Sequence, residues 1–166
     1  NALHRAIDGE ADGAHPGRGV TRYLVDTNVI IDILSRDPRW FELSAETLRA
    51  SAEVGPLAIN PIIYAELSVA FERIEDLDLA LPDADWARLP LPWAAGFLAG
   101  RCFCQYRRRG GRRARPLPDF YIGAHAAVEE LRLITRDVSR FRTYFPTVEL
   151  IAPPGTADEP DGDEAP

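Results

Sequence analysis

Three acidic residues stand where apolar runs end or where a helix is expected to begin. Asp26 directly follows the run Tyr-Leu-Val at residues 23–25, and Asp137 comes two residues after the run Leu-Ile-Thr at residues 133–135. Asp119 follows a proline, in the first turn of an expected helix. Working sites of open α/β sheets lie beyond the carboxyl ends of the strands. These three acids are therefore candidates for one shared site.

Glu66 is the fourth candidate. It lies four residues after Ile62 and three before Val69, which places it on or beside the apolar stripe of its helix. A partly buried carboxylate is unfavourable unless it is paired or binds a metal. The nearest basic side chain along the helix, Arg73, is two turns away. The spacing therefore favours a functional role for Glu66.

The other acids each have a structural alternative. Asp26 is suited to capping the helix that follows it. Asp119 is suited to stabilising a helix dipole, and Asp137 to a turn. Taken singly, none of the three identifies a function.

If the four acids converge, their charge predicts the chemistry. Clustered carboxylates repel one another and stay ionised only beside a cation, and hard oxygen ligands select Mg²⁺ or Mn²⁺. Such an ion binds substrate phosphates and lowers the pKa of a bound water. The reaction class that follows is hydrolysis of a phosphodiester.

Basic residues are concentrated directly before Asp119. Between Arg101 and Arg115 the chain has seven arginines and no acid. A cluster of unpaired positive charge attracts polyanions, so an acidic centre with a basic rim favours nucleic acid over a small phosphate ester. The expected RNA-binding residues are Arg107, Arg108, Arg109, Arg112, Arg113 and Arg115.

The overall composition excludes several enzyme classes. All 19 basic residues are arginine, against 26 acids, and the formal net charge is -7. The absence of lysine excludes Schiff-base enzymes, phosphate-binding loops ending in Gly-Lys-Ser/Thr, and phospho-acceptor receiver domains. No Gly-x-Gly-x-x-Gly follows the first apolar run, which excludes a dinucleotide-binding domain.

The charge also predicts the organisation of the chain. Five acids and no base lie in residues 153–166, whereas residues 20–152 hold 18 acids and 17 arginines. We therefore expect a flexible leader or extension at 1–19, one nuclease-like domain at 20–152, and an acidic disordered tail at 153–166. No apolar run is long enough for a membrane span, and the two cysteines are expected to be reduced, which together favour the cytoplasm.

The pattern of apolar and turn residues predicts strands alternating with helices, the α/β class with a parallel sheet. Asn28 is expected to cap the first helix, and Asn60 with Pro61 to start a helix that runs to about residue 74. Two further helices are expected over residues 76–89 and 92–109.

Four segments in order resemble the signatures of PIN-domain ribonucleases, specifically the VapC-type toxins of bacterial toxin-antitoxin pairs. They are YLVDTNVIIDIL, INPIIYAEL, YRRRGGRRARPLPDFYIGAHA and LITRDVSRF. The resemblance covers about residues 22–152. It implies a PIN-like, five-stranded parallel sheet flanked by helices, with an inserted helical pair that serves dimerisation.

The same resemblance implies an activity and a set of partners. The activity is Mg²⁺-dependent endoribonuclease cleavage of RNA such as tRNA or rRNA, with Mn²⁺ as a substitute. The partners are a second copy of the chain and a cognate antitoxin that covers the active site. The acidic quartet carries over as catalytic and metal-binding residues to Asp26, Glu66, Asp119 and Asp137, with Thr27, Asn28 and Thr135 as supporting residues.

One alternative stays open. In a non-catalytic RNA- or partner-binding module of PIN-like fold, the arginine segment would bind and the acids would be structural. That alternative predicts that Asp26→Asn leaves RNA affinity unchanged and that no metal is needed.

Overall fold

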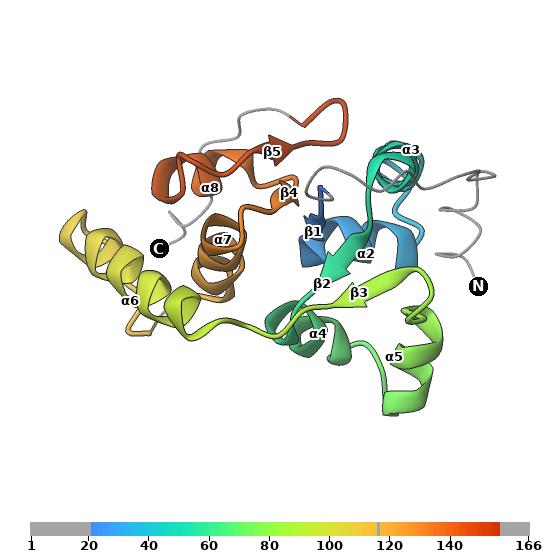
Figure 1. The fold of residues 1–166 in the computed structure, drawn as a ribbon, viewed down its shortest axis with the longest axis horizontal. Helices are drawn as coiled ribbons and strands as arrows, with labels where there is room; N and C mark the ends of the chain where they lie inside the picture. The colour runs from blue at the N-terminus through green and yellow to red at the C-terminus, as the bar shows by residue number, and fades with distance from the viewer. Residues whose placement is uncertain (1–20, 116, 157–166) are drawn as a thin grey trace.

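A computed structural model describes residues 21–115 and 117–156. Its centre is a five-stranded sheet in the order β3-β2-β1-β4-β5, in which every neighbouring pair is parallel (Figure 1). The expected leader at 1–19 and the tail from residue 157 lie outside the described residues. The strands are β1 (Tyr23–Val25), β2 (Leu57–Ile59), β3 (Trp86–Arg88), β4 (Arg132–Ile134) and β5 (Leu150–Ile151).

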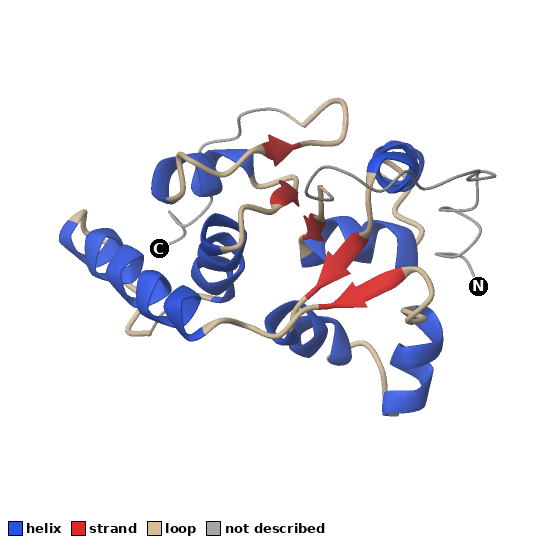
Figure 2. Ribbon diagram, in the orientation of Figure 1, coloured by secondary structure: helices blue, strands red, loops and turns tan. Residues whose placement is uncertain are grey.

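Helices surround this sheet (Figure 2). Neighbouring helices pack in a chain of contacts in which α2 contacts α3 and α4, α4 contacts α7, and α7 contacts α6 and α8. This architecture confirms the expected PIN-like α/β class. The helices are α2 (Thr27–Leu34), α3 (Phe41–Val54), α4 (Pro61–Ser68), α5 (Ile74–Ala80), α6 (Trp93–Arg108), α7 (Pro118–Val128) and α8 (Val138–Tyr144).

The central strand β1 brings the two halves of the chain together. It pairs with β2 on one side and with β4 on the other, and all three of its residues are buried. The backbone N–H of Asp26 donates to the carbonyl of Ile134 at 2.9 Å, which extends the ladder one residue past the strand. The residues that follow β1, β2 and β4 therefore meet at one edge of the sheet.

The expected helix over 76–89 is wrong. The helix of this segment, α5, ends at Ala80, and Trp86 begins strand β3 in register with Leu57. Pro82 follows the last helical turn and prevents its continuation, because proline has no backbone N–H to donate. Helix α4 is also shorter than expected, since it ends at Ser68 rather than near residue 74. The two helices α5 and α6 thus lie on either side of β3 in the chain.

Asn28 does not cap the first helix. Helix α2 begins at Thr27, two residues earlier than expected, and Asp26 occupies the N-cap position without a side-chain capping hydrogen bond. No linking residue separates β1 from the cap. The carboxylate of Asp26 and the amide of Asn28 are consequently both left for other partners.

The contact between α7 and α8 depends on Gly123. A Cβ atom at this position would collide with the ring of Phe145 and touch Phe141, both buried residues of the α8 segment. Because Gly123 lies one helical turn after Asp119, this close approach also sets the distance between Asp119 and the start of α8.

We expect Gly123→Ala to lower the free energy of unfolding by about 1–3 kcal/mol, because the added methyl overpacks the contact between α7 and α8. Gly96 is the matched control, since it lies in helix α6 with open space where a Cβ would stand. Gly96→Ala should raise the same free energy by about 0.5–1 kcal/mol, as alanine favours a helix over glycine. Equal effects of the two changes in urea denaturation would contradict this account.

No helix in the described part of the chain is long and apolar enough to cross a membrane. Cys102 is buried and Cys104 is exposed, and neither forms a disulfide.

Candidate active site

Three of the four predicted acids lie close enough to perturb one another. Asp26 comes from the end of β1, Glu66 from α4, and Asp119 from the first turn of α7. The negative charges of Glu66 and Asp119 both raise the pKa of Asp26, and the charge of Asp119 also raises that of Glu66. The sheet edge and two separate helices therefore assemble one carboxylate cluster, made of Asp26, Glu66 and Asp119.

Asp26 is the most deeply buried member, with 4% of its surface exposed. Burial raises its pKa from 3.8 to about 7, and the two neighbouring carboxylates add to this effect. Hydrogen bonds from the Thr135 hydroxyl, which donates to Oδ2 at 2.6 Å, and from the backbone of Thr27 oppose this rise in pKa. The Asn28 amide donates to the same Oδ2 atom at 2.7 Å. Asp26 stays substantially protonated near neutral pH unless a cation is present.

Glu66 is half-buried, as its spacing predicts, and burial raises its pKa. The hydroxyl of Thr27 donates to its Oε2 atom at 2.6 Å. Thr27 follows Asp26 directly in the chain. Two consecutive residues therefore supply one carboxylate of the cluster, Asp26, and the hydroxyl that holds a second one, Glu66.

Asn28 ties the start of α2 to the segment after β4. Its amide nitrogen lies 3.3 Å from the Thr135 hydroxyl, and its carbonyl oxygen accepts the backbone N–H of Arg136 at 3.2 Å. The Thr135 hydroxyl also accepts the N–H of Asp137 at 3.0 Å. The structure thus brings all three predicted supporting residues, Thr27, Asn28 and Thr135, into contact with predicted acids.

Asp137 lies beside Asp119 through a residue that the sequence analysis missed. The guanidinium of Arg140 pairs with the Asp119 carboxylate, and its Nε atom lies 3.5 Å from Asp137. Asp137 is also the N-cap of α8, where its side chain accepts the backbone N–H of Arg140 at 3.4 Å. Asp137 therefore caps α8, rather than serving only in a turn, and also lies beside the cluster. The spacing of three residues between Asp137 and Arg140 on a short helix was the available signal.

A second pair that the sequence analysis missed, Asp32 and Arg136, connects α2 to the segment after β4. Asp32 of α2 is 1% exposed and accepts the Ser44 hydroxyl at 2.7 Å. The Nε atom of Arg136 lies 3.1 Å from Asp32, outside hydrogen-bond alignment, and its guanidinium stacks on the Trp40 ring at 4.9 Å. A lone acid inside the apolar run Ile-Ile-Asp-Ile-Leu was the sequence signal for this pair.

The donor set suits a hard divalent cation in its chemistry. Each carboxylate of the cluster has one oxygen that accepts a side-chain hydrogen bond: Asp26 from Thr135 and Asn28, Glu66 from Thr27, and Asp119 from Arg140. No side chain among the described residues donates to the other oxygen of any of the three. Within residues 21–115 and 117–156, however, no three acidic, His or Cys side chains stand in position to hold an ion directly. The carboxylate oxygens are the type of ligand that a hard divalent cation prefers, and Arg140 is paired with one of the carboxylates, Asp119.

The predicted RNA-binding arginines lie at the end of α6 and in the segment leading to α7, and all six are exposed. Two of them shape this segment, since Arg107 donates to the carbonyls of Gly111 and Arg113 at 3.0 and 2.9 Å, and Arg109 stacks on the Tyr144 ring of α8 at 5.6 Å. The stacking places part of the basic segment against the helix that contains Arg140.

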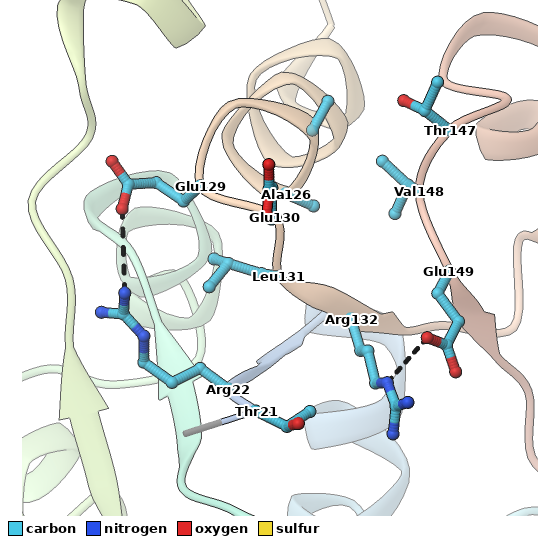
Figure 3. Close-up of a pocket in the computed structure, with 11 residues that line it drawn as sticks. Thr21, Arg22, Ala126, Glu129, Glu130, Leu131, Arg132, Thr147, Val148 and Glu149 are labelled. Carbon is cyan, nitrogen blue, oxygen red and sulfur yellow. Dashed lines mark hydrogen bonds and ion pairs between the residues drawn. The ribbon is translucent and has the colours of Figure 1, made fainter. Parts of the chain in front are cut away.

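A cavity of about 960 Å³ lies at the opposite end of the sheet (Figure 3). It is lined mainly by residues that precede β1, β4 and β5. Four of its charged side chains are paired, Arg22 with Glu129 at 3.9 Å and Arg132 with Glu149 at 2.7 Å. Because ligands of open α/β sheets bind beyond the carboxyl ends of the strands, this cavity is not the candidate site.

His125 is a core residue with 1% of its surface exposed, and its Nδ1 atom lies 3.1 Å from the Asn60 amide. Burial lowers its pKa. His125 is therefore a packing residue of the core.

Sheet order, helix contacts and the carboxylate cluster together define a PIN domain. The family model described as PIN domain matches residues 23–145, and the chain belongs to this family. PIN domains are generally nucleases. The resemblance of the four sequence segments is thereby confirmed.

Solved structures share the fold at low sequence identity. VapBC2 from Rickettsia felis, bound to a DNA fragment from its promoter, matches with a TM-score of 0.62 and 19% identity, over 80% of this chain and 98% of that chain. VapBC-1 from nontypeable Haemophilus influenzae matches with a TM-score of 0.60 and 22% identity, over 80% of this chain and 98% of that chain. A toxin-antitoxin complex from Klebsiella pneumoniae matches with a TM-score of 0.51 and 22% identity, over 79% of this chain and 97% of that chain. No curated protein matches the chain.

Proposed function

We propose that this protein is a Mg²⁺-dependent endoribonuclease and the toxin of a toxin-antitoxin pair. The observation that carries the proposal is the cluster of Asp26, Glu66 and Asp119, in which a buried carboxyl has a pKa raised to about 7 and lies close enough to two further acids for their charges to act on it. Such an arrangement is unfavourable for stability alone, because a buried charge without a cationic partner is costly. A divalent cation would remove that cost.

Asp26, Glu66 and Asp119 would hold the ion, through the oxygens that no described side chain engages. A bound Mg²⁺ supplies Lewis acidity toward a phosphate and a lower pKa for an attacking water. Thr135 and Asn28 fix the carboxylate of Asp26, and Thr27 fixes that of Glu66. Because these bonds come from neutral donors, they orient the carboxylates without cancelling their charge. Asp137 adds a fourth negative group through its contact with Arg140.

The proposed partners are an antitoxin and a second copy of the chain. Helix α6 lies beside α7 at one edge of the molecule (Figure 1) and exposes Trp93 and Phe97, at 97% and 75% of their surfaces. Exposed aromatic side chains one helical turn apart are typical of a contact surface. The matched structures include a toxin-antitoxin complex. We assign the protein to the cytoplasm with its RNA substrate, such as tRNA or rRNA.

The test is to incubate the pure protein with total RNA, with and without Mg²⁺, and to map the new ends. We expect cuts that require Mg²⁺ or Mn²⁺ and leave 5′-phosphates, since water is the nucleophile. RNA binding with no cleavage under either condition would instead support the non-catalytic binding module.

The arginine segment makes a prediction about binding. Replacing Arg112 and Arg115 by glutamine should weaken RNA affinity and lower the slope of log K against log salt by about 1.4, because single-stranded nucleic acid releases about 0.7 counterions per contact. The double change Arg36→Gln with Arg73→Gln is the matched control, since both side chains are exposed elsewhere on the surface. An equal slope in both variants, measured by fluorescence anisotropy, would refute a specific role for the segment.

A further inference from the structure

Arg140 places a permanent positive charge among the acids of the site. Its guanidinium pairs with Asp119 from α7 and lies 3.5 Å from Asp137 at the start of α8, and only 21% of its side chain is exposed. The guanidinium group does not lose its proton at any working pH, and its planar donors match carboxylate oxygens. Two acids from different elements thus share one cation that belongs to the chain.

The other two acids have no such partner. In the described part of the chain, the side-chain donors to Asp26 and Glu66 are hydroxyl and amide groups, and no arginine contacts either carboxylate. The site is therefore divided in its electrostatics. Asp119 and Asp137 share one positive charge that belongs to the chain, whereas Asp26 and Glu66 depend on a cation from solution.

The fold holds Arg140 in this place. It lies in the first turn of α8, whose capping residue is Asp137, and α8 packs on α7 where Gly123 admits the rings of Phe141 and Phe145. Phe141 is the residue after Arg140, and Phe145 lies one helical turn after Phe141. The guanidinium is thus positioned by the same contact that brings α8 against Asp119, and it is not a mobile surface side chain that happens to touch an acid.

We propose that Arg140 takes the place of a second divalent cation, so that the site binds a single ion, beside Asp26, Glu66 and the free oxygen of Asp119. This inference rests on the proposed function, because it assumes that the cluster binds a divalent ion at all. Where two carboxylates share a fixed guanidinium, a second ion has to displace it and meets like charge. One ion from solution and one cation from the chain then complete the site.

The test counts bound Mn²⁺ by electron paramagnetic resonance, with Mn²⁺ alone and no RNA. We expect one ion per wild-type chain and two per chain in Arg140→Met, because methionine has a side chain of similar length but lacks the positive charge that Asp119 and Asp137 share. Arg140→Lys retains the charge and should bind one ion. Arg142→Met, an equal loss of charge at an exposed position of the same helix, should also bind one ion.

Two results would overturn the inference while leaving the proposed function intact: two ions in the wild type, or one ion in both the wild type and Arg140→Met. The wild-type count alone tests the point if Arg140→Met does not fold, which far-ultraviolet circular dichroism reports. No bound ion in the wild type would remove the proposed function, and the inference with it. Loss of the wild-type ion in Asp26→Asn confirms that the ion counted is the one at the cluster.

Discussion

Asp26→Asn is expected to reduce Mg²⁺-dependent RNA cleavage at least about a thousandfold, which corresponds to roughly 4 kcal/mol of activation free energy. Asp26 is the carboxylate on which the cluster is centred, since both Glu66 and Asp119 act on its pKa. The amide keeps one oxygen to accept the bonds from Thr135 and Asn28 but lacks the negative charge that binds the ion. Initial rates on a labelled RNA measure the effect.

Asp76→Asn is the control for this change, because Asp76 is an exposed acid on α5. It should cleave at the wild-type rate. A wild-type rate in Asp26→Asn would remove the carboxylate cluster from the mechanism and favour the alternative in which the arginine segment only binds.

The second large effect is on stability. In the absence of divalent ions, Asp26 should cost the native state up to about 4 kcal/mol of unfolding free energy above neutral pH, because each pKa unit corresponds to about 1.4 kcal/mol. The pKa of Asp26 is about 7 in the folded chain against 3.8 for an exposed aspartate. Between these values the unfolded chain ionises and the folded chain does not. This contribution to stability is therefore complete below pH 4 and is lost as the pH rises through 7.

Urea denaturation of the wild type and Asp26→Asn at pH 5 and pH 8 measures this effect, since the difference between the two proteins isolates one group. Asp26→Asn should be the more stable protein at pH 8, and the difference should shrink at pH 5. Adding Mg²⁺ should stabilise the wild type at pH 8 and leave the variant unchanged. Parallel pH dependences of the two proteins would show that Asp26 is not held in a raised-pKa state.

The acids at strand ends could be predicted from the sequence because each follows a short apolar run or a proline, and parallel strands bring such residues to one edge. Glu66 could be predicted because a carboxylate on an apolar stripe is conspicuous. Asp32 carries the same signal, a lone acid in an apolar helix, yet its partner Arg136 is more than a hundred residues away. No local pattern pairs the two.

The strand β3 and the position of Arg140 could not be predicted from local sequence patterns. Trp86 reads as part of a helix by its neighbours, and only its pairing with β2 makes it a strand. Arg140 is one of 19 arginines, and only its spacing of three residues from Asp137 distinguishes it from Arg136 or Arg142. Its place among the carboxylates follows from the packing of α8 on α7, which is a property of the whole fold.

The hydrogen bonds from Thr135 and Asn28 have a consequence for protein synthesis. The bond from Thr135 to Asp26 and the two bonds that Asn28 makes beyond β4 span 107 to 109 residues of the chain. During translation, Asp26 and Glu66 leave the ribosome well before Thr135 and Arg140 have been made. The site therefore cannot assemble on an incomplete chain, and a ribosome that makes a nuclease of this design is not exposed to it until nearly the whole domain has been translated.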